Sequence, residues 1–76
     1  MTAIEVLRFK NAAPYQPFEM LLADGRALPI PHPDFISVRE EDELVWLYGL
    51  AGGLESIDLM LVVSLRFPIQ TAAAKR

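Results

Sequence analysis

The spacing of hydrophobic residues changes along the chain, and each spacing predicts a different element. Over residues 2–12 apolar side chains recur at the interval of a helix. The apolar residues of this segment are Ile4, Val6, Leu7 and Phe9. Thr2 and Glu5 match the capping box, in which each side chain satisfies a free amide of the first turn. Residues 2–12 are therefore predicted to form a helix that packs on another element, because so short a helix is marginal alone.

From Phe18 onward the period of the pattern is two, which is typical of strands. The pair Asp24-Gly25 is a strong hairpin signal, because both residues tolerate positive φ. Strands are predicted over residues 18–22, 26–30, 35–39, 44–48, 54–59 and 62–67, with an acidic turn over residues 40–43. The strand over residues 44–48 is apolar on both faces, so we expect it to be covered on both sides.

One helix followed by short strands at regular spacing predicts a mainly β domain, shaped as a small, strongly bent five-stranded barrel. We expect a single domain over residues 1–69 and a C-terminal tail over residues 70–76. Hydrophobic residues make up 53% of the 76 positions, which is more than so small a domain buries well. The excess predicts a homo-oligomer that completes its burial between subunits.

The charge balance narrows the classes of partner. The chain carries seven Lys and Arg residues against ten Asp and Glu residues, a net charge of −3. Two of the bases are Lys75 and Arg76, so the preceding residues carry a net charge of −5. This balance disfavours general binding to nucleic acid. We also expect no membrane partner and a cytoplasmic location, since no apolar run reaches the length of a membrane span.

The absence of cysteine and the presence of a single histidine, His32, weigh against a bound cofactor or metal. His32 and Asp34 lie in the same proline-framed segment and are candidates for proton transfer in an enzyme. The alternative is a rigid loop in which His32 forms a local cap or hydrogen bond. No hydroxyl residue has a plausible placement as a nucleophile beside this pair, so we expect no enzymatic activity and no catalytic residues.

Two segments resemble the motifs of the Sm-like fold family, which includes the bacterial Hfq branch. In residues 22–28 a leucine precedes the turn glycine Gly25 by three positions, and a further apolar residue follows it by three. Residues 57–59, followed by Val62 and Leu65, resemble the second Sm motif. The chain is also similar to small bacterial proteins of no established activity that carry the pattern ADGR…HPDF…DLLLV. The resemblance implies an N-terminal helix, a small open barrel of five strands and assembly into a ring.

The resemblance also suggests where a ligand would bind. The residues of the candidate ligand or nucleotide loop are His32, Asp34, Phe35, Ile57 and Asp58. RNA-binding Sm rings have a basic residue in the second motif, whereas Asp58, Met60 and Leu61 occupy the matching positions. A carboxylate repels phosphate, so an RNA- or nucleotide-binding ring is the alternative and not the leading hypothesis. Trp46, Tyr48 and Phe35 could stack on bases, although packing in a core or an interface is the simpler interpretation.

The leading hypothesis is a non-enzymatic, homo-oligomeric structural or interaction module. In an open barrel the edge strands carry unpaired amide and carbonyl groups. We expect the strand over residues 44–48 of one subunit to pair with the strand over residues 62–67 of the next, which closes a ring. The residues of the candidate oligomer interface are Leu44, Trp46, Leu47, Val63, Leu65 and Phe67.

Overall fold

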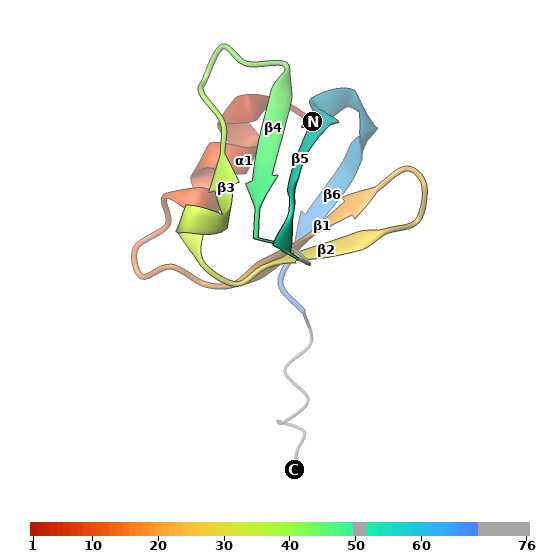
Figure 1. Ribbon diagram of the computed structural model, residues 1–76. Helices are drawn as coiled ribbons and strands as arrows, with labels where there is room; N and C mark the ends of the chain where they lie inside the picture. The colour runs from red at the N-terminus through yellow and green to blue at the C-terminus, as the bar shows by residue number, and fades with distance from the viewer. Residues whose placement is uncertain (50–51, 69–76) are drawn as a thin grey trace.

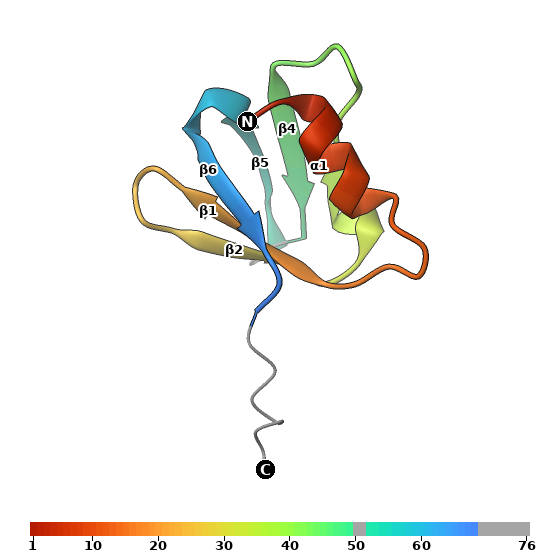
Figure 2. The ribbon, with the colours of Figure 1, turned by 180° about the vertical axis from the view of Figure 1, so that it is seen from behind.

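The computed structural model of the chain describes residues 1–49 and 52–68, and the predicted tail lies outside the described residues. Within these ranges the protein is mainly β, with one N-terminal helix and two small antiparallel sheets (Figures 1 and 2). The coarse prediction of a helix followed by short strands is therefore confirmed. No helix among the described residues has both the length and the apolar character needed to cross a bilayer.

Helix α1 spans Ala3–Lys10 and begins where the sequence predicts. The Thr2 hydroxyl accepts a hydrogen bond from the Glu5 backbone N–H, and the Glu5 carboxylate accepts one from the Thr2 N–H. The helix ends earlier than predicted, with Asn11 as its C-cap. The residues it buries are Ala3 and Val6, while Ile4 is exposed. Ile4 lies about 100° around the axis from Ala3, at the side of the buried face.

The first sheet has the order β2-β1-β6 and consists of β1 (Phe18–Leu22), β2 (Ala27–Ile30) and β6 (Val62–Arg66). Strands β1 and β2 form the predicted hairpin. Gly25 has a φ of +93°, a conformation that glycine adopts without strain. Strand β6 pairs with the other edge of β1, with a bulge at the end of that strand.

The second sheet has the order β3-β4-β5 and consists of β3 (Ile36–Ser37), β4 (Leu44–Tyr48) and β5 (Leu54–Asp58). Strand β4 pairs with β3 on one side and with β5 on the other. It is the central strand of this sheet, so the expectation that it offers a free edge to a neighbouring subunit is wrong. Its second edge is occupied because β5 pairs with it in antiparallel register (Figure 1).

The described part of the chain has six strands, whereas the predicted barrel has five, and its two sheets do not close into a barrel. The segment after β2 does not continue as a strand, because Pro31 and the short 3-10 helix η1 (Pro33–Phe35) interrupt it. Proline lacks the N–H that a continuing ladder needs. A second 3-10 helix, η3 (Leu59–Leu61), joins β5 to β6, and these two strands do not pair with each other.

The core lies between the two sheets and α1. Its members are the buried apolar residues Ala3, Val6, Phe18, Met20, Leu22, Ile30, Ile36, Val38, Val45, Leu47, Ile57, Leu59 and Val62. The alternation predicted for β1 is confirmed, since Phe18, Met20 and Leu22 all point inward. On β4 the inward side chains are Val45 and Leu47. None of the described polar or charged residues is buried, so any recognition chemistry in this part of the protein is at its surface.

Candidate functional site

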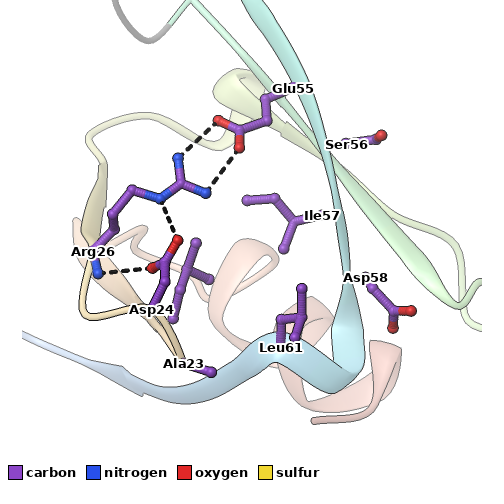
Figure 3. Close-up of a pocket in the computed structure, with 9 residues that line it drawn as sticks. Ala23, Asp24, Arg26, Glu55, Ser56, Ile57, Asp58 and Leu61 are labelled. Atoms are coloured by element: carbon purple, nitrogen blue, oxygen red, sulfur yellow. Dashed lines mark hydrogen bonds and ion pairs between the residues drawn. The ribbon is translucent and has the colours of Figure 1, made fainter.

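A surface hollow of about 430 Å³ separates the β1–β2 hairpin from strand β5 (Figure 3). Its apolar floor is formed by Leu22, Ile57 and Leu61. The rest of its wall consists of Ala23, Asp24, Arg26, Glu55, Ser56 and Asp58. The volume is within the usual range of small-molecule sites, which runs from roughly 300 to 1,000 Å³. The hollow follows the free edge of β5, so it is also open to an incoming strand.

Arg26 bridges the mouth of this hollow and joins the two sheets. Its Nε atom lies 2.9 Å from Asp24 Oδ2, within its own hairpin. Its Nη1 and Nη2 atoms lie 3.4 and 3.0 Å from the two carboxylate oxygens of Glu55 on β5. Figure 3 shows the guanidinium between the two carboxylates. We call these three residues the Arg26 clasp.

The local folding explains why the clasp forms. The Asp24 side chain accepts a hydrogen bond of 3.0 Å from the Arg26 backbone N–H, which orders the turn. Glu55 pairs with Leu47 across β4 and β5, so it occupies an inward position at the end of β5 where the core gives way to solvent. The Glu55 side chain is still 46% exposed, and Arg26 of the hairpin lies within hydrogen-bond distance of it.

The clasp leaves the hollow acidic. The hydrogen bonds from the Arg26 backbone and side chain lower the pKa of Asp24. Hydrogen bonds to Glu55 and then to Asp24 raise the pKa of Arg26. With Asp58 on the rim, three carboxylates accompany one guanidinium, and three of its five N–H groups already donate to Asp24 and Glu55. An anionic ligand would therefore meet net repulsion here.

The five residues of the predicted ligand loop are not brought together. The ring of Phe35 lies against Gly49, just past the end of β4, where an added Cβ would come within 3.3 Å of the Phe35 ring. Asp58 pairs with Leu44 at the opposite end of the same strand. Five residues of extended strand separate these two ends by roughly 15 Å. Ile57 belongs to the core and to the floor of the hollow.

His32 acts as a local cap in the structure. Its Nδ1 atom accepts a hydrogen bond of 3.2 Å from the Asp34 backbone N–H at the start of η1. The Asp34 carboxylate lies 3.6 Å from the same nitrogen. A nitrogen that accepts an N–H has no proton to donate to that carboxylate. Both side chains are exposed, with exposed fractions of 60% and 87%, so the pair lacks the enclosure that proton transfer in an enzyme needs.

The predicted interface residues fall into separate groups. Leu44 and Trp46 lie on the outer face of the central strand β4 and are partly exposed. Val63 and Phe67 are exposed along and just beyond β6, which is an edge strand, and Leu65 is half-buried there. Leu47 has an exposed fraction of 1%, so it is a core residue and offers no surface to a partner.

Sequence reasoning did not identify the Arg26 clasp. The available signal was the alternation of β5, which puts Glu55 on the same face as the buried Ile57. A carboxylate at such a position indicates that a cation comes from elsewhere in the fold. The two residues are 29 positions apart in the chain, and only the tertiary structure shows that Arg26 provides the cation.

Within residues 1–49 and 52–68, no three His, Asp or Glu side chains are grouped so that they could hold a metal ion. Comparison with protein-family models, curated proteins and solved structures found no match to the chain.

Proposed function

We propose that the protein is a non-enzymatic interaction module that associates with further copies of itself through two of its edge strands, β5 and β6. The observation that carries this proposal is the pair of edge strands β5 and β6, which follow each other in the chain without pairing. An exposed edge presents unpaired N–H and C=O groups and readily accepts another strand. In this proposal β5 of one copy pairs with β6 of the next.

The hydrogen-bond pattern identifies the groups that would pair. The N–H of Gly49 donates to the carbonyl of Gly53, and the N–H of Leu59 donates to the carbonyl of Glu43. In an antiparallel ladder, bonded and non-bonded pairs alternate. The backbone groups of alternate β5 residues, Ser56 among them, therefore point away from β4 and toward the free edge.

Apolar surface lies beside both edges. Leu54 and Leu61 are exposed next to β5, and Val63 and Phe67 are exposed along β6. Burying such side chains contributes about 25 cal/mol for each Å² of apolar surface removed from water. The two edges differ from each other, so their contact is head-to-tail, and contacts of this type close into rings when the rotation permits.

The two edges differ in charge. Strand β5 carries Glu55 and Asp58, and its hollow is acidic. A second hollow, of about 330 Å³, lies between α1 and β6 and includes both Arg8 and Glu5, whose charges balance, beside Val63 and Leu65. Two acidic β5 edges would repel each other, whereas a β5 edge meets no such net repulsion at a β6 edge, which favours the pairing of unlike edges.

The order of the elements supports an Sm-like version of this module. An N-terminal helix precedes antiparallel strands, and the last two strands are joined by one short 3-10 turn. We include the strongly bent five-stranded barrel in this proposal. In it β2 and β3 are counted as two pieces of one interrupted strand. The alternative is an RNA-binding ring, and tight binding of RNA in a titration would favour it.

The test is the mass in solution of the wild type and of two variants at one position. Light scattering at micromolar concentration should give the wild type a mass several times 8.5 kDa. Ser56→Pro removes an N–H that points to the free edge and preserves the ladder to β4, so it should yield a folded monomer. The control is Ser56→Ala, which retains the N–H and should remain assembled.

Circular dichroism should show that both variants are folded. A monomeric wild type at all concentrations would overturn the proposal. A folded Ser56→Pro variant of unchanged mass would show that the copies associate through another surface.

A further inference from the structure

The outer face of β4 carries an indole that the fold does not cover. Trp46 is in the middle of a central strand, yet its exposed fraction is 39%. Its cross-strand neighbours are Ser37 on β3 and Ser56 on β5. Directly opposite residues share a face of the sheet, and serine is too short to screen an indole on either side. The ring is therefore available to a ligand.

A hollow of about 350 Å³ lies beside this indole, lined by Arg39, Asp42, Glu43, Leu44 and Trp46. Arg39 and Asp42 satisfy each other, with 3.1 Å between Nη2 and Oδ1 and a second hydrogen bond from the Arg39 backbone N–H. The Glu43 carboxylate has no ion pair or hydrogen bond among residues 1–49 and 52–68. The hollow thus combines an apolar wall with one unbalanced negative charge.

Charge selects among the ligands that use an exposed indole. A nucleotide would bring phosphate toward Glu43 and toward Glu40 and Glu41 of the same turn, where like charges repel. A cation is attracted by the negative face of the indole and by the Glu43 carboxylate. An ordinary ammonium is strongly hydrated, whereas a methylated ammonium has an apolar surface that matches Leu44 and Trp46.

We propose that the hollow beside Trp46 binds a small quaternary ammonium ion. The cation rests on the indole, its methyl groups contact Leu44, and Glu43 balances its charge. The hollow faces outward from the central strand and is not on the free edge of β5 or β6. The inference is therefore independent of self-association and would survive its failure.

The single tryptophan makes a direct test possible, because all indole emission comes from Trp46. Choline chloride should change this emission in a saturable way. Sodium chloride at the same ionic strength and dimethylbutanol, the neutral isostere of choline, should not. Glu43→Gln should weaken choline binding severalfold. Glu41→Gln, in the same turn but outside the hollow, removes the same charge and should leave the affinity nearly unchanged.

The Trp46→Leu variant lacks the fluorophore, so its choline binding is measured by calorimetry. We expect no heat of binding for this variant. A lack of saturation with wild-type protein would overturn the proposal. An equal response to dimethylbutanol would also overturn it, because the charge would then be irrelevant. If Glu41→Gln and Glu43→Gln weakened choline binding equally, the effect would come from the overall negative charge of the turn, and the proposed site would be refuted. Tighter binding of a trimethyl-lysine peptide would support the site and assign its ligand to a modified protein.

Discussion

The hairpin at Gly25 allows backbone strain to be measured without interference from packing. Gly25 has a φ of +93°, and a Cβ added there would meet no atom within 4 Å. The penalty for an L-residue is therefore conformational, about 1–2 kcal/mol for alanine. We expect Gly25→Val to cost more than Gly25→Ala, since a β-branched residue at positive φ is a genuine outlier.

The control for this prediction is the mirror-image residue. D-alanine at position 25, introduced by chemical synthesis, favours positive φ and also restricts the unfolded chain. It should be neutral or stabilise the protein by about 0.4–1 kcal/mol. Gly49→Ala offers a contrast, because its Cβ would also press on the Phe35 ring at 3.3 Å. It should therefore cost more than Gly25→Ala.

The assay is urea denaturation at one fixed protein concentration, because self-association would make stability depend on concentration. Thermal melting is a second readout: in a domain of this size, a loss of 1 kcal/mol in the free energy of unfolding lowers Tm by about 4–8 °C. Equal stability of the glycine and L-alanine proteins would refute the strained hairpin. So would equal destabilisation by L- and D-alanine, since a steric clash and not handedness would then be the cause.

Three other expectations follow from the structure. The lowered pKa values of Asp24 and Asp42 mean that the folded state binds protons less readily than the unfolded chain. The stability that these two carboxylates contribute is fully present above their ordinary pKa of 3.8, and it is lost as pH falls through the lowered pKa values. Acid titration followed by circular dichroism checks this expectation. Met20→Ala should lower the free energy of unfolding by about 2–5 kcal/mol, because Met20 is fully buried. Met60→Ala, at an exposed fraction of 86%, should change it little. Equal effects in urea denaturation would contradict the core assignment. Labelled oligo-U and oligo-A should bind weakly and lose affinity as salt is added, and sub-micromolar binding abolished by Phe35→Ala would instead favour the nucleic-acid alternative.

Local signals predicted the features that depend on a few adjacent residues. The capping box set the start of α1, and Asp24-Gly25 set the hairpin between β1 and β2. The inward set of β1 followed from simple alternation. Within α1, however, the pattern did not determine which side faces the core. The Ile4 side chain is exposed because Ala3 and Val6 occupy the face of the helix that packs on the sheets.

The candidate site depended on contacts between distant segments. The pattern of β4 showed a strand apolar on both faces, but not that β3 and β5 occupy both of its edges. The residues of the predicted ligand loop are divided between two places for the same reason. Residues near His32 and residues near Asp58 were assigned to one site, yet the second sheet places them at opposite ends of β4.

The sequence by itself determined the class of fold, the positions of its turns and the acidic balance of charge. Each of these depends on local backbone preferences, on periodicity or on composition. Only the tertiary structure decided which strands became edges, that Arg26 meets Glu55, and that Trp46 lies uncovered between two serines. These features arise from pairings between segments far apart in the chain. A pairing of this kind is selected by the free energy of the whole packed core and is not encoded in any single segment.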